Sequence, residues 1–395
     1  MKIAAVICEY NPFHKGHAYH LAETRKQIGC DYVVGIMSGS FVQRGEPAAL
    51  DKWVRAEMAL SCGLDAVFEL PCVYALSSAQ YFAQGGVSLA SALGADFLSF
   101  GSESPLEVIQ RYVDVRKKGD YTLRLYEHLN AGLSYPQAAT LAYGSGLNRI
   151  SPNDLLGIEY MSSIAEQDVR LEPAAIPRIH IQHDSADTAE GFASAKQIRT
   201  ELRKDKYGQE VKDYIPEQAY AIMEEWIASN GIGTLETYDL PILSRIRSQG
   251  KEALNQMPFA GGGLGSLVYN HACNVRTVAE LIDACTSKYY MTTRISRFLL
   301  QILLDMSLCT EPVPYGRLLG FRRDSSKLIG ELERRSSVPV VKSVAAYRGS
   351  LSDDSVAKKM LETDIRAQDL HGLAFTGEQV VKAGRDYTMP MVIVG

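Results

Sequence analysis

The stretch Ile3-Ala-Ala-Val-Ile-Cys-Glu-Tyr-Asn-Pro-Phe-His14-Lys-Gly16-His17 decides the fold. An apolar run of strand length leads into a turn with two histidines, and helical spacing follows the turn. Residues three apart at the start of a helix lie on one face, beside unpaired backbone N–H groups and the positive end of the helix dipole. The turn is therefore suited to holding phosphates, and Gly16 lets a phosphate approach the backbone. A metal pair or plain polar surface is the alternative, but no carboxylate or cysteine lies nearby at ligand spacing.

The first hundred residues alternate between apolar runs of strand length and segments of helical period. This alternation predicts a parallel α/β sheet with helices on both faces. Such sheets bind ligands at the carboxyl ends of their strands. We expect the histidine turn and the loops 38–47, 69–71 and 100–103 to meet there over one crevice. The predicted strands are 2–8, 32–37, 66–70 and 97–100, and the predicted helices are 17–28, 52–62 and 78–93.

A second helix start suited to phosphates begins at Ser194 and ends in the cation Arg199. Ser151-Pro-Asn153 predicts another capped helix, in which Asn153 is either a cap or a nucleotide contact. Arg44 and Lys52 are expected to be solvated surface charges, although either could reach a phosphate or RNA.

Length and composition set the outer bounds. The 395 residues predict two domains or three, with enough apolar content for their cores. Hydrophobic runs are all shorter than the roughly 20 residues that span a bilayer, and the apolar start is too short for a signal peptide, so no membrane partner and a cytoplasmic location are expected. Seven scattered cysteines without a Cys-x-x-Cys pair predict reduced thiols rather than structural zinc.

Residues 206–395 predict a mainly helical domain that follows a nucleotide-binding domain over residues 1–205. Apolar residues at helical spacing predict helices at 218–228, 277–285, 294–306 and 325–335. The glycine-rich segment 260–265 is not a P-loop, because no Gly-Lys-Ser/Thr follows it. We expect it to be a flexible surface loop.

Positive charge is concentrated in the second half. Residues 288–348 hold 11 Lys and Arg against five acids, although the whole chain has a net charge of −5. A basic patch within an acidic protein favours RNA binding, and four aromatics among these cations could stack on unpaired bases: Tyr289, Tyr290, Tyr315 and Phe321. Solvated helix faces and core aromatics are the alternative. The predicted RNA contacts are Arg44, Lys288, Arg294, Arg297, Arg322 and Arg323.

Several phrases together resemble the bacterial tRNA(Met) cytidine acetate ligase family, within the HIGH-type nucleotidyltransferase superfamily. The phrases lie at 10–20, 37–47, 68–71, 151–153, 194–199, 286–289, 292–297, 314–321 and 386–390, so the resemblance covers essentially the whole chain. The loop 37–47 and the C-terminal phrases are the most specific. The segment 194–199 lacks the hydroxyl pair and Thr often seen in the superfamily, so no role is predicted for Ala195 and Lys196.

The resemblance implies a Rossmann-like α/β domain with a parallel sheet, followed by a mainly helical domain. It implies that ATP activates acetate as acetyl-adenylate and that the acetyl group passes to N4 of the wobble cytidine in elongator tRNA(Met). Three residues, His14, His17 and Arg199, would stabilise charge as pyrophosphate leaves. The implied ATP contacts are Ile7, Cys8, Glu9, Tyr10, Asn11, Pro12, Phe13, His14, Lys15, Gly16, His17, Ala18, Tyr19, His20, Gly101, Asn153, Arg178, Ser194 and Arg199.

Mg²⁺ is expected with ATP, held mostly by phosphate oxygens and water, and no metal site of the protein's own is predicted. Two other classes of function stay open: a small-molecule adenylyltransferase and a non-catalytic RNA-binding protein. The first would need little beyond the α/β domain, and the second is disfavoured because both phosphate-binding elements are intact. The sequence does not decide the acyl group, the tRNA or whether the chain forms a homodimer.

Overall fold

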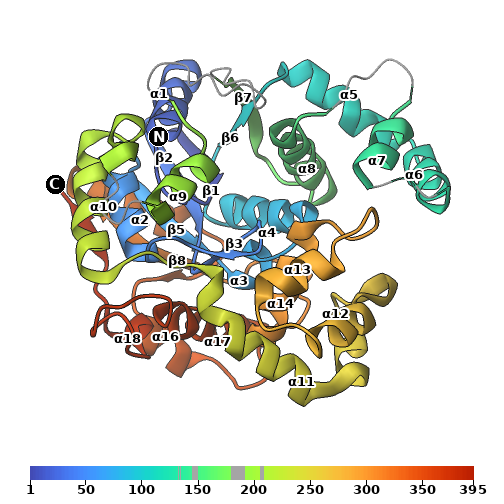
Figure 1. Cartoon of the computed structure of the whole chain (residues 1–395). Helices are drawn as coiled ribbons and strands as arrows, with labels where there is room; N and C mark the ends of the chain where they lie inside the picture. Colours follow the sequence, from blue (N-terminus) through green and yellow to red (C-terminus); the bar gives the residue numbers. More distant parts are fainter. Residues whose placement is uncertain (132, 134, 145–149, 179–191, 205–208) are drawn as a thin grey trace.

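The protein is built on a mixed sheet with helices on both faces (Figure 1), as seen in a computed structural model that describes residues 1–131, 133, 135–144, 150–178, 192–204 and 209–395. Among these residues the strand order is β10-β8-β5-β2-β1-β6-β7, with β9 paired to β8. Every neighbouring pair in this sheet is parallel except β5 and β8. The strands are β1 Ile3–Cys8, β2 Tyr32–Ser38, β5 Ala66–Leu70, β6 Phe97–Ser102, β7 Glu172–Pro177, β8 Gly316–Arg322, β9 Val340–Val341 and β10 Val392–Val394.

Side chains of the central strands point alternately to the two faces of the sheet, and each face has its own hydrophobic core. Ile3 and Ile7 of β1 belong to one core, whereas Val6 and Cys8 belong to the other. The first core is covered by α4 Ala79–Ala92, α8 Pro152–Glu166, α15 Ser326–Arg335 and α17 Val356–Gly372, and the second by α1 Lys15–Ile28, α2 Lys52–Ser61, α9 Ala195–Lys204 and α10 Glu217–Asn230. A sheet buried on both faces explains why its strands are almost continuously apolar.

The predicted elements of the first hundred residues are confirmed. Strand β5 coincides with its prediction, and the other strands and helices of this region differ from theirs by at most two residues at either end. Three additional helices stand beyond α8 (Figure 1): α5 Leu106–Lys117, α6 Asp120–Asn130 and α7 Tyr135–Ala142. A short helix, α3 Cys72–Ala75, and a two-stranded hairpin, β3 Phe41–Val42 with β4 Glu46–Pro47, follow strands of the sheet.

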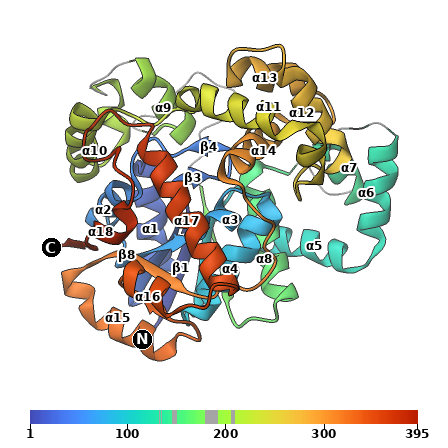
Figure 2. The ribbon, with the colours of Figure 1, turned by 90° about the horizontal axis from the view of Figure 1, so that it is seen from below.

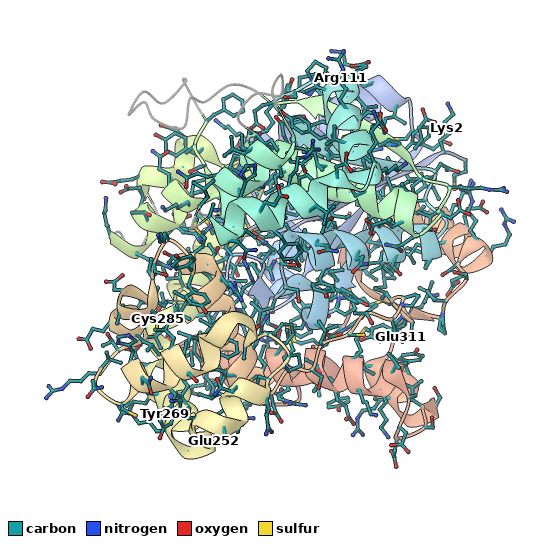
Figure 3. All side chains as sticks on the ribbon, turned by 90° about the vertical axis from the view of Figure 1, so that its right-hand side faces the viewer. Lys2, Arg111, Glu252, Tyr269, Cys285 and Glu311 are labelled. Carbon is teal, nitrogen blue, oxygen red and sulfur yellow. The ribbon has the colours of Figure 1, made fainter. Side chains whose placement is uncertain are left out.

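The second half is mainly helical, as predicted. Helices α11 Asp239–Gln256, α12 Leu264–Ala272, α13 Val278–Cys285 and α14 Thr292–Leu304 pack together. Figure 3 shows this group at the opposite end of the molecule from Arg111 of α5, with Glu252, Tyr269 and Cys285 labelled. Two shorter helices complete the half: α16 Val344–Ser350 and α18 Arg385–Thr388. The glycine segment forms a 3₁₀ turn at Gly261–Gly263 and the start of α12.

The second half also supplies three strands to the sheet, which the sequence analysis did not predict. Strand β8 runs antiparallel to β5, and β9 and β10 extend the sheet beyond it. Helix α17 crosses the molecule beside α3, as Figure 2 shows from below. The division at residue 205 stays a prediction, but the sheet contains strands from both sides of it.

A buried ion-pair network joins the two halves, and it corrects the prediction that Lys52 is a solvated surface charge. Lys52 has no exposed side-chain area, and its Nζ lies 2.9 Å from Glu69 Oε1 and 2.8 Å from Asp386 Oδ1. Arg317 contacts the same two carboxylates at 2.7 and 2.8 Å. Next to it, Arg385 pairs with buried Asp51. Charged side chains tolerate such burial only when they are paired.

Two further observations concern membrane-spanning helices and the thiols. Within the described residues, no helix is both long enough and apolar enough to cross a membrane. All seven cysteines are free, with Cys8, Cys72 and Cys285 buried and Cys273 exposed.

Candidate active site

The histidine turn lies between the carboxyl end of β1 and the first turn of α1. His14 is the N-cap residue of α1, and its Nδ1 accepts a hydrogen bond from Gly16 N at 3.1 Å. His17 Nδ1 in turn accepts from His14 N at 3.2 Å, which completes a capping box made of two histidines. A Cβ on residue 16 would lie 2.9 Å from His14 Cε1, so the imidazole can fold over the backbone only because this residue is glycine.

Both imidazoles are held in the same tautomer. Because each Nδ1 accepts a backbone hydrogen bond, the single proton of a neutral ring lies on Nε2. The two rings stack with centroids 3.7 Å apart and an interplanar angle of 21°. Neither Nε2 has a hydrogen-bond partner among the described residues. His14 and His17 therefore offer a nearly parallel pair of N–H donors that one oxyanion could accept.

Burial keeps these histidines neutral. Desolvation, with help from the Arg178 charge, lowers the pKa of His14 to about 3. Burial and the neighbouring His14 and His20 hold the pKa of His17 well below its usual range, and burial lowers the pKa of His20 to about 4. His20 is fixed further by a hydrogen bond at 3.1 Å to Ser99 Oγ, which also bonds Thr24. All three rings are neutral donors near pH 7.

The other predicted contacts in the turn are of two kinds. Ile7, Cys8, Tyr10, Pro12 and Phe13 are buried, so they offer a ligand backbone atoms rather than side chains. The rings of Tyr10 and Phe13 lie edge-on to each other and contact the ring of His17. The half-buried residues along the turn and the first turn of α1 are Glu9, Lys15, Gly16, Ala18, Tyr19 and His20.

Arg199 is brought to the turn, as its predicted role requires. Its Nη1 donates to Asn11 O at 2.9 Å, and its Nη2 forms an ion pair with Glu46 at 3.1 Å. Asn11 Oδ1 accepts from Ala49 N at 2.7 Å, so the turn, the loop after β4 and helix α9 are tied together. Ser194 caps α9 by accepting from Gln197 N at 3.2 Å.

Arg178, Asn153 and Gly101 meet at the carboxyl ends of β6 and β7. Glu103 links them: it forms an ion pair with Arg178 at 3.2 Å and accepts a hydrogen bond from Asn153 Nδ2 at 2.6 Å. A Cβ on Gly101 would lie 3.3 Å from Arg178 Cγ. The Arg178 side chain is 45% exposed, so its guanidinium remains accessible beside the histidine turn.

The β3–β4 hairpin joins the histidine turn to α14. Gln43 N donates to Glu9 Oε1 at 2.8 Å, and Gln43 O accepts from Arg297 Nη1 at 3.0 Å. Gly45, with φ +79°, packs against the backbone of α14, where a Cβ would lie 2.5 Å from Arg297 N. Arg44 lies exposed at the tip of this hairpin.

The predicted RNA contacts do not form one surface. Arg44, Lys288, Arg294 and Arg297 lie on the hairpin, on α14 or just before it. Arg322 is the last residue of β8 and Arg323 follows it. Strand β8 is antiparallel to β5, and Arg322 N donates to Asp65 O, just before β5 begins. These two arginines therefore lie at the edge of the sheet opposite the histidine turn. Five other cations of the basic segment form ion pairs with acids: Arg317, Arg334, Arg335, Lys342 and Arg348.

The four aromatic residues that were candidates for base stacking differ in their exposure. Tyr315 is buried and donates to Asp364 at 2.7 Å, and Phe321 is partly buried against a core, so the stacking prediction is wrong for Tyr315. Tyr290 bonds Gly262 O and lies under the Arg294 guanidinium. Tyr289 is 57% exposed with Lys288 Nζ 5.0 Å from its ring centroid.

Sequence reasoning missed Arg55, which is fully buried beside the carboxyl ends of β1 and β2. Its guanidinium donates to Glu9 O at 2.7 Å, to Ser38 O at 3.0 Å and to Gly39 O, so it fixes the ends of β1 and β2. Burial lowers its pKa to about 10, which leaves it charged. No local pattern distinguishes this arginine from a surface residue of α2.

Known proteins resemble this chain over essentially its whole length. Residues 1–386 match the family described as HIGH Nucleotidyl Transferase. The tRNA(Met) cytidine acetate ligase of Acetivibrio thermocellus is 33% identical over 100% of both chains, and that of Caldanaerobacter subterraneus is 36% identical over 99% of this chain and 100% of the relative. The crystal structure of Thermotoga maritima TmcAL bound with alpha-thio ATP superposes with a TM-score of 0.90 at 29% identity, covering 100% of each chain.

Proposed function

Since the chain belongs to the HIGH nucleotidyl transferase family and groups with its tRNA(Met) cytidine acetate ligases, we propose that it is an ATP-dependent ligase. It joins acetate to N4 of the wobble cytidine in elongator tRNA(Met). The observation that carries this proposal is the pair of Nε2–H donors on His14 and His17 at the start of α1. The reaction takes place in the cytoplasm, where tRNA and ATP are found together.

The first step forms acetyl-adenylate. An acetate oxygen attacks the α-phosphorus of ATP in line, and pyrophosphate leaves. Such a displacement needs mainly positioning and charge stabilisation. The histidine pair and the α1 N-terminus supply preorganised donors, while Arg199 and Arg178 supply positive charge on either side of the turn. Gly101 and Asn153 complete the nucleotide contacts near Arg178.

Mg²⁺ would neutralise charge on the phosphates when it accompanies ATP. Within the described residues, no group of three or more His, Cys, Asp or Glu side chains is placed to hold a metal ion. His14 and His17 are also unsuited to Mg²⁺, which prefers oxygen ligands, because they offer N–H groups. Phosphate oxygens and water would therefore provide most of the ligands.

The second step transfers the acetyl group to RNA. The cytosine amine attacks the acyl carbon, and AMP leaves. We place the RNA on a surface made of Arg44, Lys288, Tyr289 and Arg294, which we call the hairpin surface. The hairpin carries Arg44 directly beside the histidine turn through Gln43 and Glu9, so an anticodon loop held here lies next to the crevice. Arg322 and Arg323 would need a separate contact with the same RNA.

A direct assay tests the proposal. The protein is incubated with ATP, ¹⁴C-acetate and total tRNA, and the RNA is then digested and separated into nucleosides. We expect label in N4-acetylcytidine, dependent on ATP, together with acetate-dependent exchange of pyrophosphate into ATP. Exchange without labelled RNA would favour a small-molecule adenylyltransferase, and tRNA binding without exchange would favour a non-catalytic RNA-binding protein.

A further inference from the structure

Glu9 is the single acid among residues 7–20, the segment in which the phosphate contacts are expected. One carboxylate oxygen, Oε1, is fixed by the hydrogen bond from Gln43 N at 2.8 Å. The other, Oε2, has no hydrogen bond or ion pair to any residue that the structure describes. The side chain is half-buried and follows β1 directly, two residues before Asn11 of the turn. Glu9 therefore keeps one carboxylate oxygen without a hydrogen-bond donor among the described residues.

A carboxylate is unsuited to contact phosphates. Like charges repel more strongly in a partly buried site than in water, so Glu9 would weaken ATP binding if its side chain faced the phosphates. The family resemblance implies that Glu9 contacts ATP, and we assign that contact to its backbone rather than to its carboxylate. The side chain instead suits a ligand group that donates hydrogen bonds.

We propose that Glu9 Oε2 accepts a hydrogen bond from the N4 amine of the wobble cytosine and takes its proton during acetyl transfer. This inference rests on the proposed function. A carboxylate is the acceptor that proteins use to read the cytosine amine. Gln43, which donates to Glu9, precedes Arg44 of the hairpin surface in the same hairpin. RNA bound to that surface would therefore lie close to Glu9.

The step balances in atoms and charge. The N4 lone pair attacks the acyl carbon of acetyl-adenylate and a carbon–nitrogen bond forms. The bond between the acyl carbon and the phosphate oxygen breaks, and its electron pair leaves with AMP. The proton that N4 loses goes to Glu9 Oε2, which becomes a neutral carboxylic acid and later releases the proton to water.

The other titratable groups near Glu9 either bind a proton weakly or are held in ion pairs. His14 and His20, with pKa values of about 3 and 4, and His17, with a pKa held well below its usual range, bind a proton weakly. Glu46 forms an ion pair with Arg199, and Glu103 with Arg178. Burial raises the pKa of Glu9, whereas the Gln43 hydrogen bond and the charges of Arg44 and Arg199 lower it, and Glu46 raises it. The net upward direction makes Glu9 a better base near pH 7.

The same contact would select cytidine over uridine. Uridine presents a carbonyl oxygen at position 4, so two acceptors would face each other in the crevice. A site whose polar group is left unpaired rejects the wrong ligand strongly. Glu9 therefore acts as a specificity residue as well as a base.

The test measures the two chemical steps separately in the Glu9→Gln variant. This substitution keeps the shape of the side chain and an oxygen that can accept from Gln43 N. Acetate-dependent pyrophosphate exchange reports acetyl-adenylate formation, and single-turnover transfer from enzyme-bound acetyl-adenylate to tRNA(Met) reports the second step. We expect transfer to fall at least about 100-fold and exchange less than about tenfold. Glu9→Asp should keep part of the transfer rate, and Glu107→Gln, an exposed acid at the start of α5, should keep all of it.

The pH dependence gives a second readout. Wild-type transfer should rise with pH as Glu9 loses its proton and then level off, whereas Glu9→Gln should lose this limb. Equal losses of exchange and transfer, or a Glu9→Gln enzyme with wild-type transfer and an unchanged pH profile, would overturn the proposal. A wild-type enzyme that exchanges pyrophosphate but labels no tRNA would instead refute the proposed function.

Discussion

Asp386 Oδ1 lies 2.8 Å from Lys52 Nζ, although the two residues come from opposite ends of the chain. Neither side chain is exposed, and Glu69 and Arg317 complete the network. Lys52 opens α2 directly after the loop that follows the hairpin, so this pair secures the C-terminal segment against an element that borders the crevice. Removing one partner from a buried ion pair leaves a charge without compensation.

Replacing Asp386 by Asn should therefore destabilise the protein by about 3–5 kcal/mol. Urea unfolding followed by circular dichroism measures this change. The matched control is Asp324→Asn, which removes an acid paired with Arg322 at the surface and should change the free energy of unfolding by less than about 1 kcal/mol. Similar effects for both variants would contradict the burial of the network.

Substitutions of His14 and His17 should impair the first chemical step and leave the protein folded. His14→Asn retains an N-cap residue but places no donor at the Nε2 position, and His17→Ala removes the second donor. Each change should lower acetate-dependent pyrophosphate exchange at least about 100-fold, because preorganised donors are lost. Thermal melting should stay close to wild type. If the double variant still exchanges pyrophosphate normally, the turn has a structural role.

Arg199→Ala should weaken the same step by about 1.5–3 kcal/mol, the contribution of a charge-assisted hydrogen bond. It would also leave Glu46 without its ion pair at the crevice. The kinetics of exchange at varied ATP measure the effect, and Arg203→Ala, exposed on the same helix, serves as the control. An Arg199→Ala enzyme with normal ATP affinity and rate would remove this residue from the site.

The two groups of predicted RNA contacts can be separated by experiment. Replacing Arg44, Lys288 and Arg294 of the hairpin surface with Gln should weaken tRNA binding and flatten its salt dependence, which has a log–log slope of about −0.9 for each neutralised phosphate of a duplex arm. Acetyl-adenylate formation should persist. The variant with Arg322 and Arg323 replaced should bind more like wild type, because these residues lie at the opposite edge. Filter binding at several salt concentrations provides the comparison.

His371 predicts a pH dependence of stability. It is fully buried, its Nε2 lies 2.8 Å from Ala48 O, and burial lowers its pKa to about 4. The unfolded chain binds this proton near pH 6.5, so the stabilisation is present above that pH and is lost as the pH falls towards 4. The loss amounts to about 3 kcal/mol. Denaturant titrations at several pH values should show a smaller loss for His371→Gln than for wild type.

Local pattern predicted the half of the sheet whose strands are long and apolar. Strands β1, β2, β5 and β6 follow one another with a helix between them, so period and composition were enough to place them. Strands β9 and β10 have two and three residues, and β8 contains two glycines and two arginines. They are strands because of their partners in the sheet: β8 pairs with β5, about 250 residues earlier, and β9 and β10 pair with β8. No local pattern records these pairings.

The site shows the same limit. The histidine spacing identified the donors, since their geometry depends on neighbours in sequence. The surroundings of charged residues were harder to predict, because the sequence does not show whether a lysine is solvated or paired with a buried carboxylate. Lys52 and Arg317 were therefore missed as network residues, and a single linear cluster of cations proved to be spread over separate faces.

The antiparallel pairing of β8 with β5 has a consequence for biosynthesis. Strand β5 is among the first parts of the chain to leave the ribosome, but its neighbour in the sheet and the partner of Lys52 are translated about 250 and 330 residues later. A nascent chain can therefore assemble β1, β2 and the histidine turn while one edge of its sheet is open and Lys52 has only Glu69 of its two carboxylate partners. Maturation of the crevice is thus postponed until synthesis is nearly finished, and chaperones that shield sheet edges would be needed most during that interval.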